Sequence, residues 1–263
     1  MFQSLWIGNA LSPHEIACIR SFLARGHAFR LYCYGEVANV PPGCEQADAR
    51  AILAESEVFA YKGGPEKGSY AGFANLFRYK LLRDRGGWWV DTDVVCLAAG
   101  VPTGEVSLAR EHPNLVNNAI MRFPAGHPAM HAAYDLALAA GKDIGWGEMG
   151  PQCMTAMVER FELEALLAPQ LAFYPLHWSE YAALILPEHR AFVGERLSNA
   201  NFLHLWNEMF RRTNYDKSVR PPVGSYLYDL FAEMAMLGDF EFEYVLVRDG
   251  QNATCLSKRP LAR

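Results

Sequence analysis

The sequence predicts an α/β fold in which a single domain, residues 1–263, surrounds a central and mostly parallel β-sheet. The first 34 residues have the pattern strand, helix, strand, which is the repeating unit of a parallel sheet. The segment 69–97 repeats the order of helix followed by strand. A hydrophobic fraction of 51% over 263 residues allows a sizeable core at a length that one domain still supports.

The opening unit begins with a short apolar run at 4–7, which predicts the first strand. Ser12, Pro13 and Glu15 then match the N-cap, the first position and the capping-box acid of a helix. Apolar residues follow at helical spacing. The aromatic run at 29–34 predicts a second strand, so the unit favours a parallel pair.

The strongest helical pattern in the chain lies at 69–85, where aromatic and leucine side chains recur at helical spacing. Asn75 and Arg78 are three residues apart, so they share another face of this helix. A Gly-Gly pair ends the helix, and the apolar run 88–97 predicts one strand. The remaining expected elements are helices at 128–140, 151–162 and 226–237, and a strand at 201–206 that returns to the sheet.

Composition limits the kind of partner and the compartment. The net charge of −5 and the isoelectric point of 5.9 do not suit a protein that binds nucleic acid through phosphates, so we expect no nucleic-acid partner. No stretch approaches the ~20 apolar residues that span a bilayer, and the start does not resemble a signal peptide. The six cysteines are scattered, as expected of reduced thiols. We therefore expect a cytoplasmic protein, with peripheral contact at the inner membrane face possible.

The most specific chemical signal is Asp91-Thr92-Asp93, which interrupts the apolar run 88–97. In a continuous strand, residues two apart point to the same side, so both carboxylates can reach one ion. Hard carboxylate oxygens suit Mn²⁺ or Mg²⁺ better than zinc. An ion held in this way can neutralise the charge on the diphosphate of a departing nucleotide.

Four segments of the chain, in order, resemble glycosyltransferase family 32, which includes yeast initiating mannosyltransferases, animal α1,4-galactosyltransferases and bacterial capsule enzymes. The segments are Leu5-Trp6-Ile7-Gly8, then 73–93 with its D-x-D, then Gly150-Pro151-Gln152 with Met154-Thr155, and His204-Leu205-Trp206-Asn207. The resemblance implies a glycosyltransferase-A-like fold and a retaining transfer of a hexose of the galactose, glucose or mannose class. It further implies a nucleotide-diphospho-sugar donor, most simply UDP-linked, and a hydroxyl acceptor on a glycan or a lipid-linked saccharide.

The resemblance also implies roles for individual residues. Asp91, Asp93 and, from the far end of the chain, His204 are the expected metal ligands, with Arg78 beside them at the donor. The expected donor contacts are Trp6, Asn75, Arg78, Trp89, Asn118 and Asn207. Trp6 and Trp89 fit a core-packing role equally well, and a histidine in an apolar run is often a satisfied core residue. Glu148 is a candidate for contacts to substrate hydroxyls, and no residue qualifies as a covalent nucleophile.

One departure from the family pattern keeps other functions open. Asn75 stands where relatives usually carry the aspartate that holds donor hydroxyls, which puts the donor sugar in question. A catalytically inactive sugar-nucleotide-binding protein therefore remains an alternative. A metal-dependent nucleotidyltransferase or phosphodiesterase is a second one, although it should carry a richer acidic cluster for two metals. Slow hydrolysis of the sugar donor would distinguish an active transferase from an inactive binder.

Overall fold

The computed structural model describes residues 1–248 and 254–261. Within these residues the central sheet has five strands in the order β3, β2, β1, β4, β8. All pairs are parallel except β4 with β8. The strands are β1 (Phe2–Trp6), β2 (Phe29–Cys33), β3 (Cys44–Asp48), β4 (Gly87–Val90) and β8 (Ile120–Phe123). The predicted α/β class and mostly parallel sheet are confirmed.

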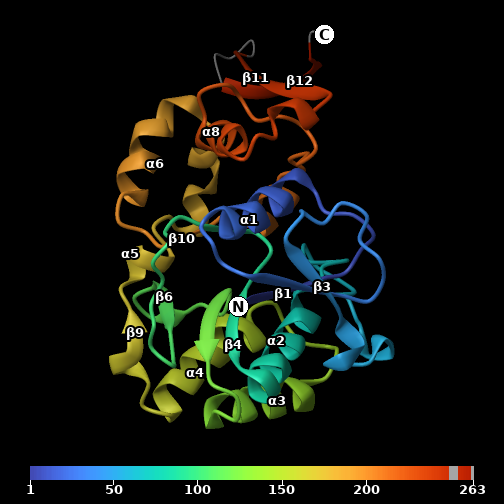
Figure 1. Ribbon diagram of the computed structural model, residues 1–263, viewed down its shortest axis with the longest axis vertical. Helices are drawn as coiled ribbons and strands as arrows, with labels where there is room; N and C mark the ends of the chain where they lie inside the picture. The colour runs from blue at the N-terminus through green and yellow to red at the C-terminus, as the bar shows by residue number, and fades with distance from the viewer. Residues whose placement is uncertain (249–253, 262–263) are drawn as a thin grey trace.

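Helices cover both faces of this sheet (Figure 1). Helix α1 (Pro13–Ala24) begins where the capping box predicts, and the Glu15 carboxylate accepts a hydrogen bond from the Ser12 backbone N–H at 2.9 Å. Its apolar side chains pack with Phe2, Leu31 and Trp88 on one face. Helix α2 (Ala71–Arg85) packs on the other face, and helix α3 (Pro128–Ala140) lies against α2. Both helices agree with the predicted ranges.

The expected single strand at 88–97 is wrong, because the chain turns after Val90. The Val94 N–H donates to the Asp91 carbonyl at 3.1 Å, and the next strand, β5 (Val94–Cys96), leaves the central sheet. It pairs antiparallel with β10 (Phe202–His204). The segment 201–206 thus forms a strand as predicted, but the strand joins β5 and not the central sheet.

The other elements extend the molecule on either side of the sheet. Helix α4 is shorter than the expected 151–162, because its first residues form a π-helical turn at Glu148–Gln152, and α8 is shorter than 226–237. The elements not yet named are β6 (Leu108–His112), β7 (Leu115–Val116), α4 (Cys153–Arg160), β9 (Leu167–Ala168), α5 (Gln170–Phe173), α6 (Arg190–Leu197), α7 (Asn207–Arg212), α8 (Tyr226–Glu233), β11 (Phe242–Arg248) and β12 (Thr254–Pro260).

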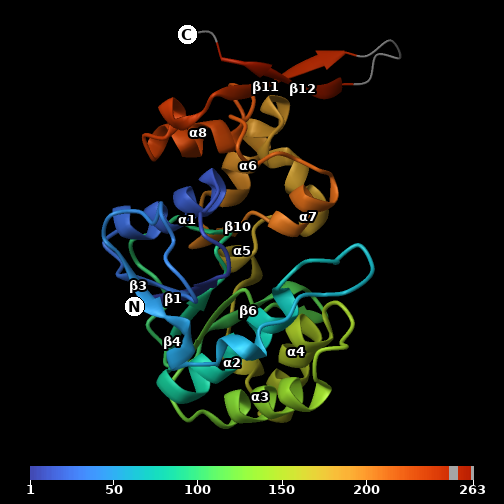
Figure 2. The ribbon, with the colours of Figure 1, turned by 90° about the vertical axis from the view of Figure 1, so that its right-hand side faces the viewer.

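The C-terminal elements stack on the side of the sheet that carries α1. Figure 2 shows α8 and the β11–β12 hairpin beyond α1, with α2, α3 and α4 at the opposite end of the molecule. Buried side chains of α1, β5, β10 and α8 form one continuous cluster between these layers. Within the described part of the chain no helix has both the length and the apolar character needed to cross a membrane. Cys18, Cys33, Cys44, Cys96 and Cys153 form no disulfide there, as expected.

Candidate metal centre and donor site

The D-x-D sequence occupies the turn that follows the carboxyl end of β4. Open α/β sheets bind their ligands at this edge, beyond the carboxyl ends of the parallel strands. The turn, and not the alternation of a strand, brings the two side chains together. Carboxylate oxygens of Asp91 and Asp93 and a ring nitrogen of His204 all lie within 4.8 Å of one another. The structure therefore brings the three predicted metal ligands together, although Asp93 and His204 are 111 positions apart in the sequence.

Asp91 is held from the sheet side. Its Oδ1 accepts a hydrogen bond from the Trp89 indole N–H at 2.8 Å and forms an ion pair with Arg78 Nη2 at 2.9 Å. Its backbone N–H donates to the Ala119 carbonyl at 2.8 Å. Because Arg78 is almost fully buried, this ion pair fixes the carboxylate firmly. The Asp91 side chain itself keeps 27% exposure, so a ligand can reach it.

Asp93 is held from the C-terminal side of the molecule. Its Oδ2 lies 3.2 Å from His204 Nε2 and accepts the Asn207 backbone N–H at 2.8 Å. Its carbonyl accepts the Leu205 N–H at 2.9 Å. The two carboxylates of the turn are thus positioned by separate parts of the chain.

A strained residue shapes the C-terminal contribution. Trp206 has φ 61° and ψ 50°, a left-handed conformation that costs a non-glycine residue about 1 kcal/mol or more. The left-handed turn at Trp206 directs the Asn207 N–H toward Asp93. His204, at the end of β10, contacts the same carboxylate. Burial of the Trp206 ring and its N–H bond to the Leu176 carbonyl at 3.1 Å stabilise this turn. The His204 ring packs on Trp206 with 4.0 Å between ring centroids.

Buried amides form a polar surface beside Asp91. Asn118 Nδ2 donates to the Asn75 side-chain oxygen at 2.8 Å and to the Tyr79 hydroxyl at 3.0 Å. A Cβ added to Gly150 would lie 3.4 Å from the Asn75 amide nitrogen, so the Gly-Pro-Gln segment packs directly against these amides. Arg78 Nη1 donates to the Asn118 carbonyl at 2.6 Å, which joins this surface to the Asp91 ion pair.

The electrostatics separate the two carboxylates. Burial raises the pKa of Asp91, and the charge of Asp93 adds to this effect against the opposing charge of Arg78. Burial also opposes ionisation of Asp93, but His204 and the Asn207 N–H outweigh it and lower the pKa of Asp93 to about 2. Burial lowers the pKa of His204 while Asp93 raises it, and the net change is upward. Asp93 and His204 therefore form an ion pair that a metal ion can replace.

The donor set fits a divalent metal ion. Among the described residues, none donates a hydrogen bond to Oδ2 of Asp91 or to Oδ1 of Asp93, so each carboxylate keeps an oxygen for a ligand. His204 Nδ1 is buried without a hydrogen-bond partner among those residues. Two carboxylates with one imidazole suit Mn²⁺, and the two carboxylates alone suit Mg²⁺.

The two tryptophans expected at the nucleotide differ in position. Trp89 is 1% exposed, and its ring lies under the Arg78 guanidinium at 4.8 Å, so it positions Asp91 and offers no open ring face. Trp6 ends β1 at the same edge of the sheet as the D-x-D turn and is half-buried. Its indole N–H donates to the Ala10 carbonyl at 3.1 Å. Glu148 is exposed in the turn before Gly150.

Two buried carboxylates near the centre have no counterpart among the predicted site residues. Glu15 is fully buried, and it accepts a hydrogen bond from Asn207 Nδ2 at 2.6 Å and pairs with Lys217. The capping box identifies Glu15 as a helix-start residue but gives no sign of this second role. Glu111, on β6, is 7% exposed and accepts a hydrogen bond from the Asn117 amide. The neighbouring Asn117-Asn118 pair is the sole sequence signal near it.

No protein-family model matches this chain, and no curated protein matches it in sequence. Solved structures with a similar course of the backbone are glycosyltransferases. The PaToxG glycosyltransferase is 14% identical with a TM-score of 0.46, over 81% of this chain and 83% of that one. GlyE of Streptococcus pneumoniae TIGR4 is 11% identical with a TM-score of 0.41, over 88% of this chain and 63% of that one. The galactosyltransferase LgtC, solved with donor and acceptor sugar analogues, is 10% identical with a TM-score of 0.40, over 78% and 86% of the two chains.

Proposed function

We propose that this chain is a metal-dependent glycosyltransferase with a glycosyltransferase-A-like fold. It transfers a hexose of the galactose, glucose or mannose class from a nucleotide-diphospho-sugar, UDP-linked in the simplest case, to a hydroxyl group. The observation that supports this most strongly is the convergence of Asp91, Asp93 and His204 at the carboxyl edge of the sheet. The buried amides of Asn75 and Asn118 lie beside it, where the hydroxyl groups of a sugar need donors and acceptors.

In this proposal Asp91, Asp93 and His204 hold Mn²⁺ or Mg²⁺, which when bound neutralises charge on the leaving nucleoside diphosphate. Arg78 fixes Asp91 through their 2.9 Å ion pair, and it adds positive charge at the diphosphate. Asn207 fixes Asp93 through its backbone N–H. The side chains of Asn75 and Asn118 orient the donor sugar.

Transfer proceeds with retention of configuration at the anomeric carbon. The acceptor oxygen bonds to that carbon on the side from which the diphosphate departs. The proton of the acceptor hydroxyl passes to a departing phosphate oxygen, so the protein supplies no dedicated base. We further propose a bacterial protein that acts in the cytoplasm, at a glycan or lipid-linked saccharide presented on the inner membrane face, in polysaccharide biosynthesis.

The test is hydrolysis of UDP- and GDP-hexoses by the purified chain with Mn²⁺, compared with EDTA. Asp93→Asn should abolish hydrolysis while preserving the fold, because the amide offers a poorer metal ligand. Asp135→Asn is the matched control, since Asp135 is exposed on α3. Full activity of Asp93→Asn, or activity in excess EDTA, would contradict the proposal.

The two alternatives predict other results in the same assay. An inactive sugar-nucleotide-binding protein would gain thermal stability from donor and Mn²⁺ without hydrolysing the donor. At 100 times its dissociation constant a bound donor adds about 2.7 kcal/mol to the stability. A nucleotidyltransferase would need a second group of acidic ligands, and the described residues contain one metal-capable group, that of Asp91, Asp93 and His204.

A further inference from the structure

A cavity lies at the opposite end of the sheet from the D-x-D turn. It has a volume of about 490 Å³. Its walls come from the amino ends of β1 and β4, from β2 and β8, and from the last residue of α2. Since β4 starts at this cavity and ends at Asp91, the two sites occupy opposite edges of one sheet.

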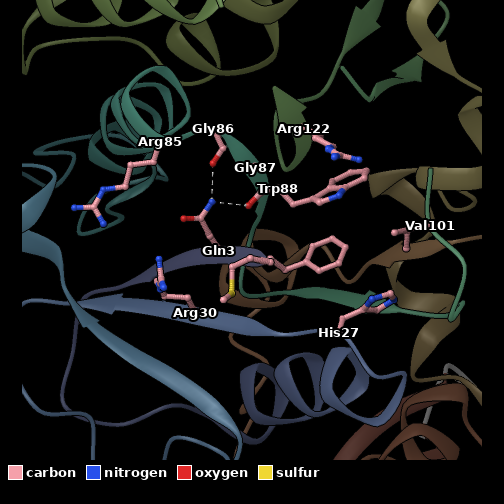
Figure 3. Close-up of a pocket in the computed structure, with 11 residues that line it drawn as sticks. Gln3, His27, Arg30, Arg85, Gly86, Gly87, Trp88, Val101 and Arg122 are labelled. Carbon is pink, nitrogen blue, oxygen red and sulfur yellow. Dashed lines mark hydrogen bonds between the residues drawn. The ribbon is translucent and has the colours of Figure 1, made fainter. Parts of the chain in front are cut away.

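The charge of this cavity is opposite to that of the whole chain, which carries a net charge of −5. Three arginines from three elements line it: Arg30 of β2, Arg85 of α2 and Arg122 of β8. His27 is a fourth basic group, and no carboxylate is among the lining residues. Figure 3 shows Arg30 and Arg85 on one side of Gln3, and Arg122 with Trp88 on the other.

The guanidinium groups keep donors for a ligand. In the described residues neither Arg85 nor Arg122 pairs with a carboxylate. Arg85 Nη1 donates to the Tyr32 hydroxyl at 3.2 Å, and Arg122 Nη1 donates to the Thr103 carbonyl at 3.1 Å. Arg30 pairs with Glu45 at 3.0 Å, but its buried Nε has no partner there. Arg85 Nη2 also donates to the Ala51 carbonyl at 3.5 Å. Each arginine is thus held in place through one or two of its nitrogen atoms, while other N–H groups stay available.

At the base of the cavity the side-chain amide of Gln3 already has hydrogen-bond partners. Gln3 Nε2 donates to the Gly86 carbonyl at 2.9 Å and to the Trp88 carbonyl at 3.4 Å. This amide bonds to the carbonyl of Gly86, directly after α2, which weakens the repulsion of an anion by this end of the helix dipole. The Trp88 ring and Val101 add an apolar wall.

We propose that this cavity binds a phosphate-bearing ligand of about mononucleotide size. Planar guanidinium groups bind phosphate oxygens in pairs. Arg30 and Arg85 lie on one side of Gln3 and Arg122 lies on the other (Figure 3), so a ligand that spans the cavity meets guanidinium groups on both sides. A single phosphate leaves most of 490 Å³ empty, whereas an attached ring or sugar fills it against the Trp88 side. The ligand differs from the sugar donor in its site and in needing no metal ion.

The experiment is calorimetric titration of the full chain in EDTA with inorganic phosphate, pyrophosphate and adenosine monophosphate. We expect saturable 1:1 binding that is tightest for the mononucleotide. Arg122→Gln and Arg85→Gln should each weaken it by about tenfold or more, because each removes a charged donor from one side of the cavity. The Arg85 side chain is exposed, so its variant should fold even if Arg122→Gln does not.

Two controls separate this site from others. Arg211→Gln removes an exposed arginine of α7 that pairs with Glu208 on the D-x-D side of the sheet, and should leave binding unchanged. Asp93→Asn should also leave it unchanged, which separates this result from the fate of the proposed transferase activity. A parallel sedimentation assay with phosphatidylglycerol vesicles tests a lipid headgroup as the source of the phosphate.

The outcomes are distinct. Vesicle binding that both cavity variants abolish, without binding of the free probes, assigns the phosphate to a lipid. The proposal is overturned if the wild-type chain binds neither the probes nor the vesicles. It is equally overturned if Arg211→Gln weakens binding as much as the cavity variants, because the arginines would then act only as general surface charge.

Discussion

Replacing His204 with alanine tests the metal centre most directly, because His204 is the ligand farthest in sequence from the D-x-D turn. The imidazole lies 3.2 Å from Asp93 and is 8% exposed. Its removal deletes one of three protein ligands. We expect the affinity for Mn²⁺ to fall by about 100-fold, equivalent to about 2.7 kcal/mol.

The same change must also destabilise the metal-free protein. It removes a buried ring that packs on Trp206 at 4.0 Å, and it deprives Asp93 of its cationic partner. Asp93 keeps the Asn207 N–H, so the expected loss is about 2–4 kcal/mol and not the full cost of an isolated buried charge. A stability measurement alone therefore cannot identify a ligand.

A second histidine supplies the control. His14 is fully buried on α1, and its ring contacts Phe210, Tyr215 and Phe231. His14→Ala should cost a similar amount of stability but leave the affinity for Mn²⁺ within about threefold of wild type, because His14 belongs to no metal-capable group. The assay is calorimetric titration with Mn²⁺, paired with urea unfolding in EDTA. Equal metal affinities for the two variants would refute the role of His204 as a ligand.

Three further predictions concern neighbouring residues. Burial lowers the pKa of His14 from 6.5 to about 3, so the unfolded chain binds a proton more readily than the folded chain. The free energy of unfolding should therefore fall by roughly 3 kcal/mol between pH 7 and 4.5. Urea unfolding should show a smaller fall over this range for His14→Leu. Asn75→Asp introduces, within reach of Asn118 Nδ2, the carboxylate that the family resembled in sequence usually carries. It should change the ranking of UDP-hexoses in donor hydrolysis by about tenfold or more. An unchanged ranking would argue against a donor contact. Asn207→Ala loses the 2.6 Å hydrogen bond to Glu15 but keeps the backbone N–H that bonds to Asp93. The affinity for Mn²⁺, measured by calorimetry, should therefore fall by less than about tenfold. A loss of affinity equal to that of His204→Ala would contradict this.

Local signals predicted the parts of the fold that local interactions determine. The capping box of Ser12 and Glu15 placed the start of α1 correctly, because a helix start depends on groups within one turn. The helical spacing in 69–85 likewise identified α2, which begins two residues later at Ala71. Neither pattern depends on residues far along the chain.

The break between β4 and β5 was not predictable in the same way. Aromatic and β-branched residues favour extended backbone on both sides of Asp91, so composition gives one continuous strand. The change of direction depends on β10, which pairs with β5 from more than 100 residues away. A local pattern carries no information about such a partner, and only the resemblance placed His204 near the D-x-D turn.

The site also contains contributions that no side-chain pattern encodes. Asn207 reaches Asp93 through its backbone N–H, and any residue except proline provides that group. The position of this N–H depends on the left-handed backbone conformation of Trp206. The sequence does not predict this conformation for a tryptophan. Glu15 was assigned to a helix start, while its pairing with Lys217 requires the folded C-terminal segment.

The two aspartates of the D-x-D turn are held by two different parts of the chain. Asp91 contacts Ala119, next to the sheet, and Arg78 of α2. Asp93 instead contacts His204 of β10 and Asn207 of α7. An ion bound by both carboxylates would therefore join the sheet to the C-terminal segment. Its binding free energy would then stabilise the contact between these two parts as well as the site itself.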